Sequence, residues 1–344
     1  MQDSASSTAS GSAHRFAIEV CDVPDERRAS LKRFRELREQ CLDMLRGDSP
    51  ASVTSQIHDL TWKTAVFRTL NEARRIEASR PANGPLWELV VEGYVHQMTI
   101  GIRKLVDRHH NSNSITNVVS TLNENVELFT RENYVTHDGL PFDYDPAFER
   151  HITSFSGVVS PKAVWVPTTG PEAWDTSKRM HEMFDVLCGT PSPRAREQKM
   201  QPCVLTNLLT NLGDDRIRKI RKLANQVHAH ADRSASKPGA LTVTTFNDLH
   251  DALRTIVRVT NFVSSTLLND AAFGSVVPTP QFDALEALDE PWVRGESLAQ
   301  LHEYWQKVSD EMDTWAYDSN AGFLPPNDGQ AGAGGTHLEG EERQ

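Results

Sequence analysis

The residues best suited to chemistry lie between positions 214 and 232. Six residues separate Arg221 from His228 in this stretch. Arginine holds a phosphate group through two hydrogen bonds and keeps its charge. Histidine titrates near neutral pH, so it gives or takes a proton. Such a pair indicates a site for a phosphodiester substrate, whereas the simpler alternative is a solvated helix face that carries both residue types.

The same stretch is predicted to form a helix that positions these side chains, with Asp214 or Asp215 as the cap. Its apolar residues recur at alternating spacings of three and four, the period of one buried face, and they are Ile217, Ile220, Ala224, Val227 and Ala231. At about 100° per residue, a polar stripe lies beside this face. The stripe consists of Arg218, Arg221, Asn225, His228 and Asp232. His230 falls on the opposite side, so the spacing favours His228 as the partner of Arg221.

A second polar line follows the helix that is expected between residues 86 and 107. Its members are Glu92, His96, Arg103 and Asp107, at spacings of four, seven and four. One interpretation is that this line faces the Arg221 stripe, so that Arg103 and Asp107 support the site. The other interpretation is an internal salt-bridge network or a contact between subunits.

Three stretches resemble the HEPN superfamily, and in particular its abortive-infection (Abi) type. The first is the helix described above, which carries Ile220-Arg221 and, further on, Ala229-His230-Ala231-Asp232. The others are residues 102–107 and 181–187, with the sequences IRKLVD and HEMFDVL. An arginine that a histidine follows at a short distance, late in an all-helical domain, is the signature of that superfamily. The resemblance spans roughly residues 53–268.

This resemblance implies an all-α fold, namely an antiparallel HEPN-like helical bundle with an extra N-terminal helix, a long central insertion and a C-terminal helix. It also implies a metal-independent endoribonuclease that serves phage defence through abortive infection. In that function, Arg221 would hold the scissile phosphate and His228 would act as general acid or base. The supporting residues would be Asn225, Asp232, Arg218, His230, Arg103 and Asp107. The implied partners are RNA and a second copy of the chain, because these domains typically dimerise across this helix.

Two departures from the family pattern leave a second function open. Lys222 follows Arg221 directly, at a position where HEPN ribonucleases usually have Asn, Asp or His. His230 competes with His228, because it fits the A-H-x-D string. The alternative is therefore a catalytically inactive HEPN-type module that binds RNA or protein and has a regulatory role. His230 also stands where some HEPN toxins have a tyrosine that a nucleotidyltransferase modifies, so such a partner is not indicated.

Composition and charge argue against several other classes. The net charge of −11 disfavours general nucleic-acid binding, so any RNA contact needs a local basic patch such as residues 216–222. The four cysteines lie far apart without paired spacing, which fits a reducing cytoplasm. No apolar run is long enough for a membrane span, and no secretory signal is recognisable. We therefore expect a cytoplasmic protein without membrane contact.

Neither a metal nor a cofactor is expected. His228, His230 and Asp232 form an H-x-H-x-D string, which binds zinc where it lies in a loop after a strand. Here the preceding residues are predicted to be helical, and the two histidines point to opposite sides of that helix. The sequence also has no glycine-rich phosphate loop.

The helical patterns divide the chain into four parts. Residues 1–14 are predicted to be disordered, residues 15–270 to form the HEPN-like helical domain, residues 271–316 to form a linker and a C-terminal helix, and residues 317–344 to form a disordered tail. Helices are expected at 25–47, 54–79, 86–107, 114–129, 171–187, 205–212, 214–232, 245–268 and 296–315. Ser114 and either Thr244 or Thr245 are the expected caps of their helices. Apolar stripes are expected on the first helix, with Leu31, Phe34 and Leu45 among its members, and on the third helix, with Leu89, Met98 and Ile102 facing inward. His181 and Asp185, one helical turn apart, are expected to form a hydrogen-bonded pair. An irregular insertion is expected at residues 130–170, with one short helix starting at Asp145.

Overall fold

The computed structural model describes residues 15–47, 49–76, 84–154, 166–189, 193–225, 244–271 and 273–281, together with several residues between 299 and 310. Within these ranges the regular structure is helical, and the only β-type pairing is an isolated bridge between Thr130 and Lys199. This confirms the predicted all-α class. The chain divides into two compact units, Met1–Thr279 and Pro280–Gln344. The described residues between 299 and 310 are all helical.

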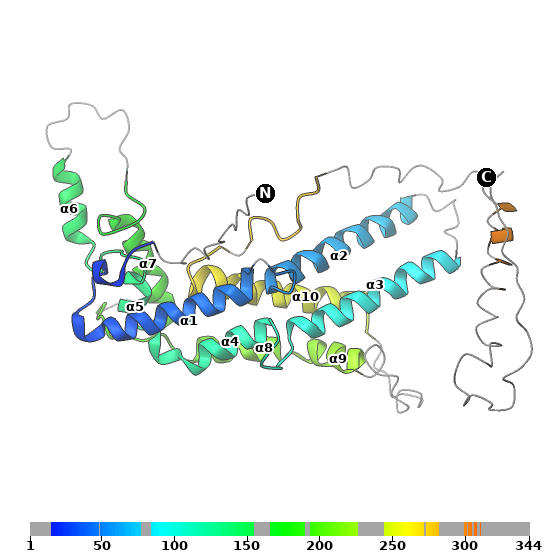
Figure 1. Cartoon of the computed structure of the whole chain (residues 1–344), viewed down its shortest axis with the longest axis horizontal. Coiled ribbons are helices and arrows are strands. Elements are labelled where there is room, and N and C mark those ends of the chain that lie inside the picture. Colours follow the sequence, from blue (N-terminus) through cyan, green and yellow to red (C-terminus); the bar gives the residue numbers. More distant parts are fainter. Residues whose placement is uncertain are drawn as a thin grey trace, which may run out of the picture. The chain divides into compact units, whose positions relative to one another are not determined.

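The first unit is a helical bundle in which distant parts of the chain pack side by side. Its longer helices are α1 (Arg28–Arg46), α2 (Val53–Ile76), α3 (Gly84–Leu105), α4 (Ile115–Glu124), α6 (Asp145–Ser154), α7 (Trp174–Cys188), α8 (Cys203–Leu212), α9 (Asp215–Leu223) and α10 (Phe246–Asn261). Shorter pieces are η1 (Ile18–Val20), η2 (Asp25–Arg27), η3 (Val126–Leu128), α5 (Arg131–Thr136) and the π-helical η6 (Phe262–Leu267). Figure 1 shows α5, α6 and α7 together at one end of the bundle, the α2–α3 hairpin at the other, and α10 between them.

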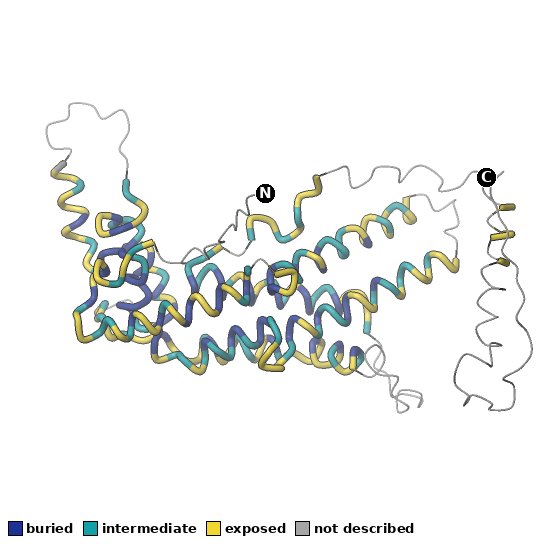
Figure 2. The backbone as a smooth tube through the Cα atoms, in the orientation of Figure 1, coloured by how far each residue is buried: buried dark blue, intermediate teal, exposed yellow. Residues whose placement is uncertain are grey.

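The apolar spacing of the sequence explains most of the core. The stripe predicted on the first helix is buried in α1, where Leu31, Phe34 and Leu45 are at most 1% exposed. The prediction for α3 holds for its second half, where Met98 and Ile102 are fully buried. Leu89, however, is 66% exposed and was wrongly predicted to face inward. The reason is that the hairpin ends of α2 and α3 extend past the helices that cover their other halves (Figure 2).

Side-chain caps define three helix starts as the sequence predicts. The Ser114 hydroxyl accepts a hydrogen bond from the backbone N–H of Asn117 at 3.1 Å and begins α4. Asp214 caps α9 through the backbone N–H of Arg216 at 2.8 Å. Thr245 caps α10 in a reciprocal capping box with Asp248. Each cap satisfies a backbone donor that the helix itself leaves unpaired.

The segment predicted to be an irregular insertion contains two helices. The one predicted to start at Asp145 is α6, whereas α5 is not predicted at all. Every residue from 131 to 137 is buried, so this segment belongs to the centre of its end of the bundle. The helix α5 is less than two turns long and its buried residues are partly polar, so it has no apolar period to recognise.

The bundle continues beyond the boundary expected at residue 270. The hydroxyl of Thr61 in α2 donates to the carbonyl of Val276 at 2.7 Å, and the ring of His58 bonds to the carbonyl of Ser275 at 3.2 Å. Residues 273–277 are therefore held along α2. Among the described helices, none combines the length and the apolar character that crossing a membrane requires.

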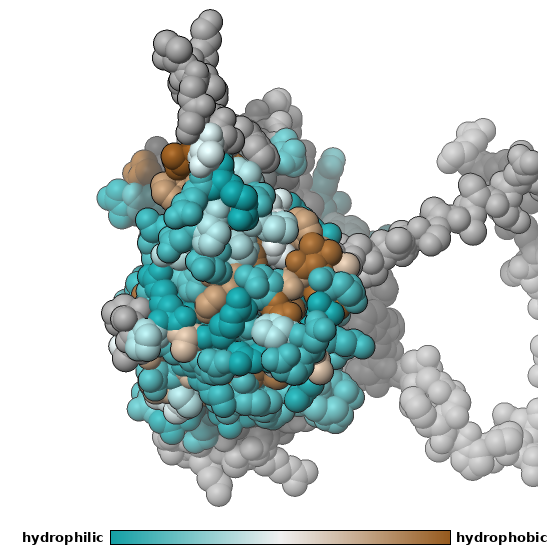
Figure 3. Space-filling view, turned by 90° about the vertical axis from the view of Figure 1, so that its left-hand side faces the viewer, coloured by the Kyte–Doolittle hydropathy of each residue, from teal (hydrophilic) through white to brown (hydrophobic). Residues whose placement is uncertain are grey.

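The end of the bundle around α6 and α7 is largely hydrophilic, with small apolar patches (Figure 3). The exposed large apolar residues of η1, α6 and α7 are Val20, Phe148, Ile152 and Val186. Scattered apolar side chains of this kind are normal on a protein surface. The candidate site lies elsewhere, on α9.

Candidate functional site

The helix α9 turns its polar stripe toward the surface because its apolar face packs against other helices. It lies against α3 and α10, and Ile217, Ile220 and Ala224 are completely buried. These are three of the residues predicted to form that face, so the predicted orientation of the helix is confirmed over its described part. The polar residues turn outward, and Arg221 is half-buried at the edge of the interface.

Ion pairs neutralise two arginines in the first part of α9 but not the arginine near its end. Arg216 pairs with Asp251 of α10 at 3.3 Å, and Arg218 pairs with Asp215 one turn earlier. Within the described ranges, no carboxylate pairs with Arg221 or with the exposed Lys222. Among the described residues, positive charge without a counter-ion therefore remains at Lys219 and in the last turn of α9.

A contact between helices brings two of the predicted supporting residues together at this end. The Nε of Arg103, in the last turn of α3, donates a hydrogen bond to Oδ1 of Asn225 at 2.6 Å. Arg103 is half-buried and Asn225 is exposed. Asn225 lies four residues after Arg221, which places the contact about one helical turn away from the Arg221 guanidinium. Arg103 thus faces the Arg221 stripe, as one interpretation of the sequence expects.

The structure separates Asp107 and His96 from this contact. Both line a groove of about 950 Å³ between α2 and α3, together with Lys104 and with Gln56, Asp59 and Lys63 of α2. The carboxylate of Asp107 accepts a hydrogen bond from the backbone N–H of His109 at 3.2 Å. Because α3 ends at Leu105, Asp107 lies beyond the helix, and the spacing of four from Arg103 no longer places the two on one face.

His228, His230 and Asp232 lie outside the described residues. The described end of the helix nevertheless bears on the choice between the two histidines. Ala224 and Asn225 adopt a π-helical turn, which holds more residues than an α-helical turn. The angle of 100° per residue that favours His228 therefore does not carry past this turn.

A second polar centre, missed by the sequence analysis, surrounds Arg131 of α5. Its side chain is fully buried and binds Asp185 of α7 at 2.7 Å and the side chain of Gln198 at 2.8 Å. It also donates to the carbonyl of His181 at 3.0 Å and lies 3.3 Å from Nδ1 of that ring. His181 and Asp185 were predicted to bond to each other, but they meet through Arg131 instead. A single buried arginine in a short helix leaves no periodic signal in a sequence.

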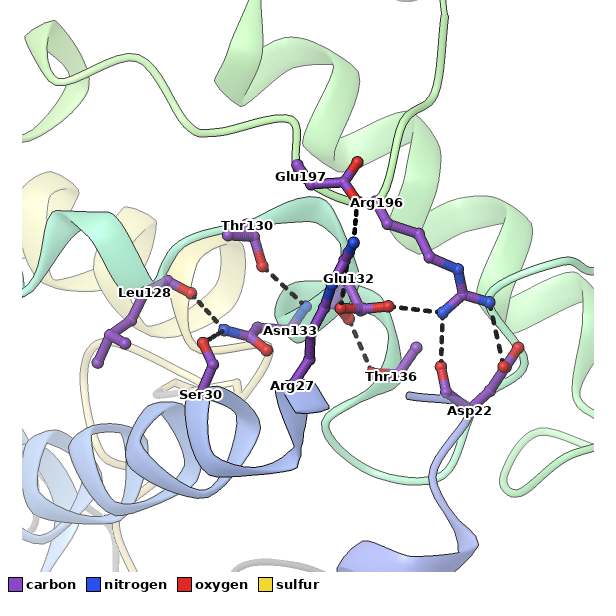
Figure 4. A network of polar contacts seen from close by, with 10 residues as sticks. All are labelled: Asp22, Arg27, Ser30, Leu128, Thr130, Glu132, Asn133, Thr136, Arg196 and Glu197. Carbon is purple, nitrogen blue, oxygen red and sulfur yellow. Dashed lines mark hydrogen bonds and ion pairs between the residues drawn. The ribbon is translucent and has the colours of Figure 1, made fainter. Parts of the chain in front are cut away.

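The next residue, Glu132, anchors two further segments on α5 (Figure 4). Its carboxylate, 3% exposed, pairs with Arg196 at 2.7 Å and with Arg27 at 3.3 Å. Arg196 also pairs with Asp22 at 3.1 Å, and Arg27 pairs with Glu197. This network ties residues 193–200 and the segment before α1 to α5. Because these buried charges already have protein partners, we assign the centre a structural role.

The electrostatics of this centre keep His181 neutral. Burial removes water from its ring and lowers its pKa to about 4, and the neighbouring guanidinium groups of Arg131 and Arg194 act in the same direction. The hydrogen bond from its Nε2 to the carbonyl of Phe142, at 2.8 Å, opposes the shift in pKa. In this arrangement Nε2 carries the proton and Nδ1 faces the Arg131 guanidinium as an acceptor.

The helical bundle and the basic end of α9 fit the resemblance to HEPN proteins that the sequence indicates. The family model described as AbiU2, within the HEPN group, matches residues 31–290. That match covers well over half of the 344 residues, so the chain belongs to the HEPN AbiU2 family. It confirms the resemblance and extends it beyond residues 53–268 on both sides. No curated protein and no solved structure matches the chain.

Proposed function

We propose that this protein is a metal-independent endoribonuclease that acts in phage defence through abortive infection. The observation that carries the proposal is the half-buried side chain of Arg221, whose guanidinium lacks a carboxylate partner among the described residues. A positive charge without a counter-ion favours the binding of an anion. A phosphodiester is such an anion, and its oxygens match the two-pronged geometry of arginine. Membership of the family adds weight to an RNA substrate.

In the proposed reaction, the 2′-hydroxyl oxygen of one nucleotide attacks the neighbouring phosphorus. A base takes the hydroxyl proton, the bond from phosphorus to the 5′-oxygen breaks, and an acid protonates that leaving oxygen. The products are a 2′,3′-cyclic phosphate and a 5′-hydroxyl. Arg221 stabilises the charge that develops on the phosphoryl oxygens, and His228 serves as the acid or the base.

The two proton transfers support a homodimer with the Arg221 faces turned inward. The polar stripe of one chain offers one histidine, whereas acid–base cleavage is easier with two. Light scattering at micromolar concentration should therefore detect a species of twice the chain mass of 38.5 kDa. A sample that contains only the single-chain species would contradict this arrangement.

The decisive experiment is cleavage of total cellular RNA by the wild type, Arg221→Lys, His228→Ala and His230→Ala. Arg221→Lys keeps the charge but loses the two-pronged contact, so we expect a strong loss of cleavage. His228→Ala should abolish cleavage with little change in the thermal melt, and His230→Ala should be milder. The reverse ranking of the two histidines would assign the acid–base role to His230. Cleavage by Arg221→Lys at the wild-type rate would refute the proposal.

A chelator serves as the control for the metal-independent mechanism. Cleavage should persist in EDTA, because Arg221 and a histidine perform the chemistry without a metal ion. Cleavage that EDTA abolishes and that zinc restores would favour a metal site at the H-x-H-x-D string.

The alternative function is a HEPN-type module that binds RNA or protein without cleaving it. Lys222 after Arg221 and the net charge of −11 favour this alternative. It would be preferred if the wild type left every cellular RNA intact and the histidine variants had no effect on cell growth.

A further inference from the structure

We infer that Arg103 is a second phosphate-binding residue, which α3 contributes and Asn225 positions, and that it holds the RNA strand next to the phosphate bound by Arg221. The inference rests on the proposed function, because it takes a phosphodiester at Arg221 as its starting point. It assigns Arg103 the role of a positioning residue, since the reacting atoms lie at Arg221.

The contact with Asn225 leaves one two-pronged edge of the guanidinium open. The Nε of Arg103 donates to Oδ1 of Asn225 at 2.6 Å. A guanidinium has only donors, so the amide atom that faces it must be the oxygen. Within the described ranges, neither Nη1 nor Nη2 of Arg103 has a hydrogen-bond partner. These two nitrogens present parallel N–H groups that fit two oxygens of one phosphate.

The surroundings of this contact are positively charged on both helices. Arg103 occupies the last turn of α3, and Arg221 and Lys222 occupy the last turn of α9. In the part of the chain that the structure describes, none of these three cations lies within ion-pairing distance of a carboxylate. In a chain of net charge −11, such a gathering of unneutralised cations is a local site for an anion.

The geometry suits two contacts on one strand. Asn225 follows Arg221 by one helical turn, and residues at that spacing are about 5–6 Å apart at Cβ. Arg103 reaches this point from a different helix, so the two guanidinium groups are fixed on separate rigid elements. Its bond to Asn225 restricts the long Arg103 side chain before RNA arrives, which lowers the entropic cost of binding. Two anchored contacts orient the strand for attack at the phosphate bound by Arg221.

A purely structural role for Arg103 makes a different prediction. Cations in the last turn of a helix stabilise it through the helix dipole. In that role, neutralising Arg103 would lower the melting temperature but leave RNA binding and its dependence on salt unchanged. RNA binding therefore distinguishes the two roles, and it does so independently of cleavage.

The test measures fluorescence anisotropy of a short labelled 2′-O-methyl RNA of mixed sequence, which lacks the attacking hydroxyl and stays intact. Affinity is measured over a range of salt concentrations. Arg103→Gln should weaken binding about tenfold. It should also reduce the slope of log K against log salt by about 0.7, because one phosphate contact is lost. Asn225→Ala should keep the slope and weaken binding less, since the charge of Arg103 remains.

Lys178→Gln is the matched control, because it removes one exposed positive charge from α7, at the other end of the bundle. Its binding should equal that of the wild type. The inference is overturned if Arg103→Gln behaves like this control, or if the wild type does not bind the RNA. Arg103-dependent binding without any cleavage of natural RNA would refute the nuclease but keep the phosphate site. If cleavage depends on Arg221 but Arg103→Gln keeps the wild-type kcat and KM, the phosphate site at Arg103 is refuted and the nuclease proposal stands.

Discussion

Acidification should destabilise the bundle through His181, the neutral histidine beside Arg131. Burial lowers its folded pKa from 6.5 to about 4. Between these values the unfolded chain binds a proton at this histidine and the folded chain does not, so the free energy of unfolding falls as pH falls. The difference of about 2.5 pH units, at about 1.4 kcal/mol for each, amounts to roughly 3–4 kcal/mol. The contribution is fully present above pH 6.5 and is lost by about pH 4.

The structural reason is that the added proton would sit on Nδ1, which lies 3.3 Å from an Nη of Arg131. Two like charges would then share a buried site. Chemical denaturation followed by circular dichroism, at a series of pH values from 7 down to about 4.5, measures the effect. The variant His181→Gln cannot titrate, so its free energy of unfolding should depend less steeply on pH than that of the wild type.

His110→Gln is the control, because it removes an exposed histidine from the loop after α3. It should keep the wild-type dependence of stability on pH. The reasoning is refuted if His181→Gln retains the full wild-type dependence, or if NMR titration of the folded protein shows His181 gaining its proton near pH 6.5.

Three further substitutions test the packing. Gly139→Ala should lower the free energy of unfolding by about 1–3 kcal/mol in thermal denaturation. The reason is that the backbone φ of Gly139 is +79° and the new Cβ would lie 2.7 Å from the Phe16 ring. Gly84→Ala is the control in the same assay. Thr245→Ala removes the capping box of α10 and should cost about 1 kcal/mol in the same assay. Asp185→Ala leaves the buried Arg131 without its carboxylate and should cost about 3–5 kcal/mol in urea denaturation; a loss below about 1 kcal/mol would contradict the pairing.

Local signals in the sequence accounted for most helices and for the class of the fold. Ser114 was predicted as a cap, and Asp214 and Thr245 were each one of two predicted candidates, because a cap acts on backbone groups two or three residues away. The buried face of α9 was recognised because its apolar residues repeat along one helix. The family resemblance rested on similarly short strings, and the family match confirms it.

Features that depend on neighbouring helices were recognised less well. The helix α5 escaped notice because its buried Arg131 and Glu132 are stabilised by partners more than 40 residues away in sequence. Leu89 was expected inside because its spacing fits the core, but at the hairpin end of α3 no described helix covers it. Asp107 was placed on the line of Arg103, although α3 ends before it.

The candidate site illustrates the same division. The sequence alone determined that Arg221 and Asn225 share one face of a helix, because the helical period is a property of the local backbone. It also suggested that the polar line of the helix expected between residues 86 and 107 would face them. Only the tertiary structure decided that Arg103, alone among the described members of that line, bonds to Asn225. It also decided that Asp251 pairs with Arg216 and Asp215 with Arg218, whereas Arg221 stays unpaired among the described residues. Such choices depend on where helices cross and end, and packing between distant segments sets both.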